Sequence, residues 1–252
     1  MEPAIALETR GLTKRFGGLV AVDGVSFSLR SGRVNAIIGP NGAGKTTLFN
    51  LVTGELRPDD GEVLAAGVPI TGLPPHRIVR EGVSRTLQIK SVFGGLTVAD
   101  NVRAAVMAHQ GIRSAFRPAA SYRAVGERVD ALIDEVGLAR HRDRKASALS
   151  YGDVALLELA LALAAEPKLL LLDEPVCGMG PEETERAVAR IRAVASKVDV
   201  VIIEHDMEVV FSLASHIVVM ASGAILAEGT PDEISRDPRV QEAYLGAPED
   251  DE

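Results

Sequence analysis

A glycine-rich loop at residues 39–47 follows directly after the apolar run Val34–Ile38. This spacing lets backbone N–H groups surround phosphates, while Lys45 reaches the β- and γ-phosphates and the Thr46 hydroxyl binds Mg²⁺. A helix expected at about 45–52 points its positive end at the same phosphates. The whole loop is a candidate phosphate site: Gly39, Pro40, Asn41, Gly42, Ala43, Gly44, Lys45, Thr46 and Thr47. The pattern predicts an α/β fold built around a nucleoside triphosphate.

Two carboxylates follow a second apolar run, at residues 169–172. Ligands of open α/β sheets bind beyond the carboxyl ends of the strands, where Asp173 and Glu174 are expected. Asp173 is predicted to hold the Mg²⁺ shell. Glu174, pointing to the other side of an alternating strand, is predicted to polarise an attacking water. An acidic turn that caps a strand is the alternative for this pair alone, and the phosphate loop favours the catalytic interpretation.

Two further polar residues are ambiguous when each is taken alone. His205 lies just after a predicted strand at 198–203, and a histidine in such a position is more often structural than catalytic. Gln88 precedes the predicted helical region, where an isolated glutamine is usually a solvated surface residue.

Hydrophobic periodicity divides the chain into three parts. Residues up to about 88 contain short strand-like runs, including 5–9 and 25–29, together with the phosphate loop. Residues of about 89–165 have helical periodicity, with helices expected at 98–109 and 122–136 and a surface loop at 111–120. From about 166 to 246, apolar strands alternate with helices, which predicts a parallel sheet covered on both faces. Residues 247–252 form an acidic tail.

Composition argues against several kinds of function. The net charge is −8 and aromatic residues make up 4 % of the chain, which argues against a basic or stacking surface for nucleic acid. The single cysteine, Cys177, excludes an internal disulfide. Residues 1–9 lack the features of a signal peptide, and no apolar run approaches the roughly 20 residues of a membrane span. We expect a cytoplasmic protein whose link to any membrane comes through a partner.

Residues 149–153, Leu-Ser-Tyr-Gly-Asp, resemble the signature loop of the ATPase subunits of ATP-binding-cassette (ABC) transporters. In that resemblance, Ser150 and Gly152 match the residues that close over the γ-phosphate of ATP held by a second subunit. Small residues at a helix N-terminus are suited to such an anion site. The resemblance therefore implies that each hydrolytic site is built at a dimer interface.

The resemblance covers about residues 4–246 and implies one ABC ATPase domain. Its fold would be a parallel-sheet nucleotide-binding core with an N-terminal antiparallel β subdomain and an inserted helical subdomain. The resemblance implies that Phe16 stacks on adenine and that Gln88 touches the metal and the attacking water and senses the membrane subunit. It also implies that Glu174 is the general base and that His205 contacts the γ-phosphate.

Within this family, four segments look like the branched-chain amino-acid uptake group, which includes urea and amide importers: residues 73–78, 178–181, 204–207 and 237–246. This likeness implies an ATPase that energises an importer from the inner face of the cell membrane. Its partners would be a second, identical or related ATPase subunit, integral membrane permease subunits and, indirectly, a solute-binding protein. A lipopolysaccharide-type exporter ATPase and a soluble regulatory ATP-binding protein are the alternatives.

The chain departs from the family pattern at a few positions. Asp153 stands where the signature loop usually has Gln or Glu, and Gly180 replaces an Asp or Asn that normally crosses the dimer contact. Ala155 and Leu161 stand where relatives commonly have arginines. Because the catalytic groups are intact, we expect ATP hydrolysis to be retained.

Overall fold

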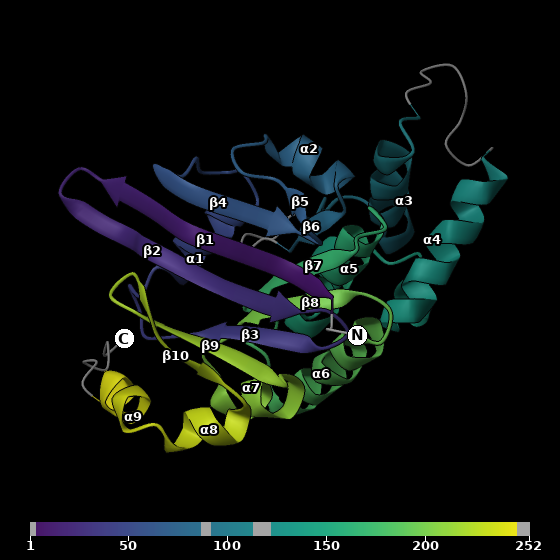
Figure 1. Ribbon diagram of the computed structural model, residues 1–252. Coiled ribbons are helices and arrows are strands. Elements are labelled where there is room, and N and C mark those ends of the chain that lie inside the picture. Colours follow the sequence, from purple (N-terminus) through teal and green to yellow (C-terminus); the bar gives the residue numbers. More distant parts are fainter. Residues whose placement is uncertain (1–3, 87–91, 113–121, 246–252) are drawn as a thin grey trace.

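The structure, a computed structural model, describes residues 4–86, 92–112 and 122–245. Gln88 and most of the predicted surface loop at 111–120 lie outside the described residues. Strands and helices form a four-stranded sheet, a six-stranded sheet and a group of helices to one side (Figure 1). The predicted α/β class, with an antiparallel sheet and a helical part added to a mostly parallel sheet, is confirmed.

The first sheet is antiparallel, with strand order β2-β1-β4-β5. Its strands are β1 Ile5–Phe16, β2 Leu19–Arg30, β4 Asp60–Ala65 and β5 Val68–Pro69. The predicted short strands at 5–9 and 25–29 were wrong in length, because β1 and β2 continue past Gly11 and Gly24. Both glycines have φ +59° and lie where the pairing register shifts, so bulges carry the strands through positions that read as turns.

The second sheet has strand order β10-β9-β3-β8-β7-β6. Its strands are β3 Val34–Ile38, β6 Val83–Arg85, β7 Leu169–Asp173, β8 Asp199–Ile203, β9 His216–Ala221 and β10 Ala224–Gly229. Neighbouring strands are parallel except β9 and β10, so the sheet is mixed rather than parallel throughout. The sequence analysis missed β10, which follows a tight turn at Ser222 and Gly223, both with positive φ.

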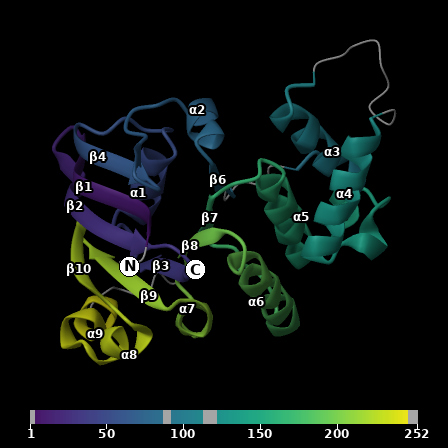
Figure 2. The ribbon, with the colours of Figure 1, turned by 45° about the vertical axis from the view of Figure 1, so that its right-hand side comes forward.

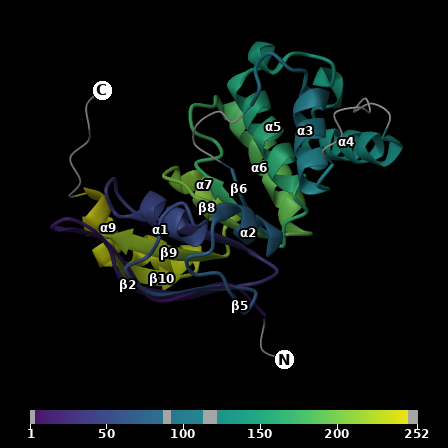
Figure 3. The ribbon, with the colours of Figure 1, turned by 90° about the horizontal axis from the view of Figure 1, so that it is seen from above.

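Helices α3, α4 and α5 form a group that lies apart from the four-stranded sheet and α1 (Figures 2 and 3). The helices are α1 Lys45–Val52, α2 Pro75–Arg80, α3 Val98–His109, α4 Arg123–Val136, α5 Tyr151–Leu163, α6 Pro181–Ala195, α7 Met207–Leu213, α8 Pro231–Arg236 and α9 Pro238–Leu245. Short 3-10 turns occupy Ala139–His141 and Ala146–Ala148. The predicted helix at 98–109 is confirmed at both ends. None of the helices within the described ranges is long and apolar enough to cross a bilayer.

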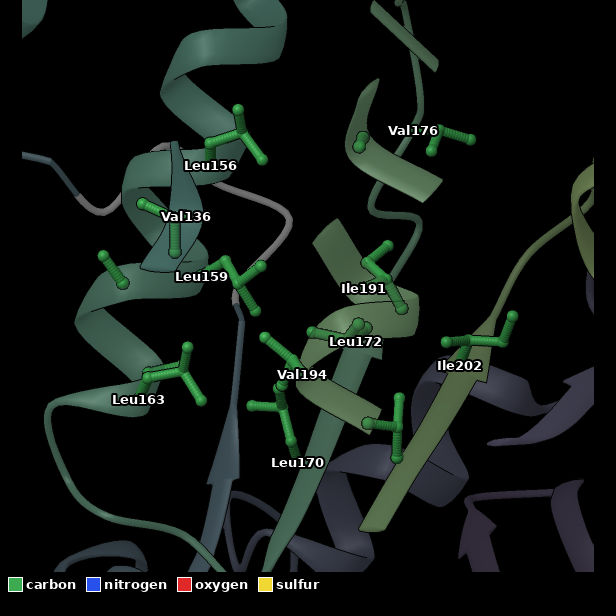
Figure 4. Packing of buried hydrophobic residues seen from close by; sticks show 14 of the residues in the cluster. Val136, Leu156, Leu159, Leu163, Leu170, Leu172, Val176, Ile191, Val194 and Ile202 are labelled. Carbon is green, nitrogen blue, oxygen red and sulfur yellow. The ribbon is translucent and has the colours of Figure 1, made fainter. Parts of the chain in front are cut away.

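A shared hydrophobic core joins the helical group to the six-stranded sheet. Figure 4 shows side chains of α5, α6, β7 and β8 packed together, among them Leu159, Leu172, Ile191 and Ile202. A second cluster fills the space between the two sheets and includes Phe49 of α1. Because α5 packs on the same core as β7, the start of α5 is held in a defined relation to the end of that strand.

The substitution Ile191→Ala tests the packing of α6 in the shared core. Ile191 is 3 % exposed, so its truncation should lower the free energy of unfolding by about 2–5 kcal/mol through lost burial and a residual cavity. The measurement is urea denaturation followed by circular dichroism. Ile5→Ala removes the same atoms from a side chain that is 39 % exposed and should change stability by about 0.5 kcal/mol or less. Equal losses in the two variants would contradict the packing described here.

Candidate functional site

The phosphate loop runs from the end of β3 into α1 and passes close to neighbouring backbone at two glycines. A Cβ atom on Gly39 would lie 2.2 Å from the carbonyl oxygen of Met220, and one on Gly44 would lie 2.3 Å from that of Ala21. The N–H of Gly223 donates to the Ala43 carbonyl at 3.1 Å, which fixes the loop from the other side. No side chain larger than hydrogen fits at these two glycines. The N-cap residue of α1, Gly44, makes no side-chain cap, which leaves the first N–H groups of this helix for an anion.

Lys45, the first residue of α1, is buried within this loop. Its ammonium donates to the carbonyl oxygens of Gly39 at 2.6 Å and Pro40 at 3.0 Å. Burial lowers the pKa of Lys45, and the negative charges of Glu174 and Asp173 oppose that shift. The structure thus brings the predicted phosphate-binding cation and both predicted carboxylates together at one edge of the sheet.

Asp173 ends β7 with a side chain that is fully shielded from solvent. Burial raises its pKa, and the Arg85 guanidinium, 2.6 Å from Oδ2, opposes the shift. The other oxygen, Oδ1, is buried without a hydrogen-bond partner. An unpaired buried carboxylate oxygen at the phosphate loop fits a Mg²⁺ ligand, and Thr46 on the first turn of α1 can supply a second.

Magnesium in nucleotide sites is typically held by one or two protein groups together with phosphate oxygens and water. Asp173 and Thr46 would be the two protein groups of such a site. Separately, the described part of the chain contains no group of three or more His, Cys, Asp or Glu side chains that could hold a metal.

Glu174 lies just beyond β7, in the left-handed backbone region with φ +49°. The prediction that strand alternation orients this side chain was wrong, because β7 ends at Asp173. Instead, the Glu174 N–H donates to the Ile203 carbonyl at 2.9 Å, and this contact with β8 supports a conformation that side chains rarely adopt. The residue lines a cavity of about 380 Å³ formed with α5 and α6.

Glu204, which the sequence analysis did not select, connects two candidate site segments. Its carboxylate is fully buried and accepts from the N–H of Val176 at 3.0 Å and from that of His205 at 3.1 Å. Burial raises the pKa of Glu204. It ties the loop after Glu174 to His205, whose side chain is 61 % exposed and points away from the core. The sequence signal that could have identified Glu204 is its position directly after four apolar strand residues, 200–203.

Phe16 ends β1 and is 46 % exposed, so its ring is open to a stacking partner. The Lys14 ammonium lies 5.6 Å from the ring centroid, within the range of a cation–π contact. The hairpin that carries Phe16 reaches the phosphate loop, because Ala21 of β2 contacts Gly44. Adenine stacking on Phe16 stays a prediction.

Ser150 is the N-cap of α5 and Gly152 lies in its first turn; α5 belongs to the helical group, which lies apart from α1 (Figure 2). The Ser150 hydroxyl caps α5 by accepting from the Asp153 N–H at 3.3 Å. The same hydroxyl and the Gly152 N–H donate to the Glu183 carboxylate of α6, and these contacts lower the pKa of Glu183. The Glu183 carboxylate thus lies against the predicted anion site. That Ser150 and Gly152 bind the ATP of a second subunit stays a prediction.

Asp153, the unusual residue of the signature loop, is buried rather than turned toward a partner. One oxygen lies 3.3 Å from Nε2 of His141 and the other lies 3.7 Å from the Arg186 guanidinium. The Asp153 carboxylate is therefore accommodated by side chains of its own chain.

Two family models match this sequence. One, described as ABC transporter, matches residues 22–177, and the other, described as branched-chain amino acid ATP-binding cassette transporter, matches residues 224–250. The high-affinity branched-chain amino acid transport ATP-binding protein BraF of Pseudomonas aeruginosa is 42 % identical over 248 residues, which cover 95 % of this chain and 97 % of BraF. The corresponding LivG protein of Escherichia coli K12 is 39 % identical over 251 residues, with the same coverage.

Solved structures of ATP-binding cassettes have a fold similar to that of this chain. A nucleotide-free ATP-binding cassette from an ABC transporter superposes with a TM-score of 0.86 and 31 % identity, covering 96 % of this chain and all of that one. The ADP conformation of MJ1267, another such cassette, gives a TM-score of 0.85 and 32 % identity, covering 96 % of this chain and 99 % of that one.

The substitution Glu204→Gln tests the buried carboxylate through the pH dependence of stability. Because the folded-state pKa is raised above the ordinary value of 4.5, the folded protein binds this proton more tightly than the unfolded chain does. The contribution of Glu204 to stability therefore falls as the pH rises from about 4.5 through the folded-state pKa. E204Q lacks this ionisation and should lose less free energy of unfolding than the wild type over that interval.

Urea denaturation at a series of pH values measures this difference. Glu62→Gln removes a carboxylate that is 66 % exposed and should follow the wild-type pH profile. Parallel profiles for E204Q and the wild type would show that Glu204 titrates as it does in the unfolded chain.

Proposed function

Since this chain belongs to the family of ABC-transporter ATPases, we propose that it binds and hydrolyses ATP to energise the uptake of branched-chain amino acids or related small polar solutes. The observation that carries the proposal is the convergence of Lys45, Asp173 and Glu174 at one sheet edge. Identity of 42 % to BraF along almost the whole chain, and a branched-chain family match at residues 224–250, support the solute class.

In the proposed reaction, the triphosphate lies along the phosphate loop and the adenine stacks on Phe16. The Lys45 ammonium exchanges the carbonyls of Gly39 and Pro40 for oxygens of the β- and γ-phosphates. Glu174 orients a water for in-line attack on the γ-phosphorus and accepts its proton, while His205 donates to the γ-phosphate. The bond from the γ-phosphorus to the β–γ bridging oxygen breaks as the new P–O bond forms, and ADP and phosphate leave. Mg²⁺, held by Asp173 and Thr46, would supply positive charge against the phosphate oxygens. Gln88, which lies outside the described residues, is proposed to contact the metal and the water.

The proposed working unit contains two ATPase subunits, identical or related. Ser150 and Gly152 of each chain would contact the γ-phosphate of ATP on the other; in support, α5 belongs to the helical group, which lies apart from α1 of the same chain (Figure 2). We propose that the assembly docks on integral permease subunits at the inner face of the membrane and receives solute from a binding protein. Gln88 and the helical group would pass subunit closure to the permease.

The substitution Glu174→Gln tests the proposed base. It keeps the size of the side chain but removes the proton acceptor, so ATP turnover should fall by about 10²–10⁴-fold while ATP binding is retained. Phosphate release measures turnover, and size-exclusion chromatography with ATP measures the trapped dimer. Glu62→Gln, on the exposed face of β4, is the control and should turn over ATP at the wild-type rate. Unchanged turnover in E174Q would remove Glu174 from this role.

Reconstitution tests the solute class. The chain, its permease subunits and the matching binding protein are placed in lipid vesicles, and ATP-dependent uptake of labelled leucine is compared with that of unrelated solutes. We expect leucine, isoleucine or valine to accumulate and to stimulate ATP turnover. Stimulation by a chemically unrelated solute alone would contradict the proposed solute class without affecting the ATPase assignment.

A further inference from the structure

Arg85 occupies a buried position between the two elements that carry the predicted Mg²⁺ ligands. It is the last residue of β6 and its side chain is only 7 % exposed. Its guanidinium lies between Asp173 at the end of β7 and Asn50 on α1. Its charge is compensated by the Asp173 carboxylate at 2.6 Å and by that of Glu55 at 3.6 Å, while its Nε is buried without a hydrogen-bond partner.

The contact with Asp173 determines which way the carboxylate faces. One guanidinium nitrogen donates to Oδ2 at 2.6 Å, while Oδ1 is buried without a hydrogen-bond partner and is available to a metal. The Asp173 N–H also donates to the Thr86 hydroxyl at 3.3 Å, so the backbone at the strand end is held from β6 as well. With Oδ2 and the backbone fixed, the planar carboxylate presents Oδ1 in one direction.

The contacts with α1 hold the other metal-binding element. A second guanidinium nitrogen donates to Oδ1 of Asn50 at 2.6 Å, and the guanidinium carbon lies 5.6 Å from the centroid of the Phe49 ring. Asn50 follows Thr46 by one helical turn, so the two residues share a face of α1. A guanidinium is a rigid fork, and here it contacts both α1 and β7, the elements that carry Thr46 and Asp173.

We propose that Arg85 is a positioning residue that sets the Mg²⁺ affinity of the site by holding Thr46 and Asp173 at the spacing that one metal ion requires. This inference rests on the proposed ATPase function and adds a residue that acts on the metal through Asp173 and α1. Groups that orient metal ligands typically change metal affinity by about 10–100-fold when they are removed.

The test separates metal binding from nucleotide binding. A fluorescent ATP analogue is titrated in EDTA to measure binding to the phosphate loop alone. Mn²⁺ binding to the ATP-loaded protein is then measured by electron paramagnetic resonance. Arg85→Gln should weaken Mn²⁺ binding by about 10–100-fold and leave the affinity for the analogue in EDTA within about twofold. Arg80→Gln, an exposed arginine at the end of α2, is the matched control and should leave both affinities unchanged.

Two further variants separate position from charge and from folding. Arg85→Lys keeps the positive charge but cannot reach Asn50 and Asp173 together, so it should weaken Mn²⁺ binding nearly as much as R85Q. Asn50→Ala loosens α1 while leaving the buried ion pair intact, and it should weaken Mn²⁺ binding by a smaller factor even if R85Q fails to fold.

Wild-type Mn²⁺ affinity in R85K or in N50A would overturn the proposal, as would a loss of analogue binding in EDTA that matches the loss of Mn²⁺ binding. If the wild type itself does not bind the analogue in EDTA, the proposed ATPase function fails instead.

Discussion

The parallel pairing of β8 with β3 on one side and β7 on the other is the constraint on which the site depends. Ile203 pairs with Ile37 of β3 and also with Asp173 of β7, so the three strands end at the same level. The phosphate loop, the pair Asp173–Glu174 and the pair Glu204–His205 leave these ends in turn. Backbone hydrogen bonds therefore bring together groups that lie more than a hundred residues apart in the chain.

This arrangement carries an electrostatic cost, because the strands that deliver the carboxylates are apolar and buried on both faces. Asp173, Glu204 and Lys45 are all buried. Burial raises the pKa values of the two carboxyl groups and lowers the pKa of Lys45, so it favours the neutral form of each. Compensation is local and specific: a guanidinium for Asp173, two backbone N–H groups for Glu204, and two carbonyls with two nearby carboxylates for Lys45. The site therefore has few ways to rearrange without leaving a charge unpaired.

Much of this could be predicted from the sequence where the determinant is local. The phosphate loop, the apolar strands around it and the helix α3 have characteristic residue spacings that act over a few positions. The continuation of β1 through Gly11 could not be predicted, since a glycine reads as a turn unless the partner strand that supplies the bulge is known. Strand β10 was not predicted because it follows the tight turn at Ser222 and Gly223.

The residues that support the site were harder to predict than the residues that form it. Arg85 and Asn50 are separated by 35 positions, and no periodic pattern connects them. Glu204 resembles any acidic residue after a strand until the burial of its side chain is known. The direction of Glu174 depends on where β7 ends and on a hydrogen bond to β8, which are properties of the folded sheet. Long-range packing, and not local propensity, decides these features.

The hydrogen bond between Gly223 and the phosphate loop has a consequence for biosynthesis. Gly223 donates to Ala43 and accepts from Asp23, so the turn between β9 and β10 joins two segments made near the start of translation. A chain that emerges from the ribosome N-terminus first cannot complete the loop until nearly all of its residues have been synthesised. The contacts of Gly223 with the phosphate loop and with β2 are therefore among the last to form, and a chain that ends before residue 223 lacks them.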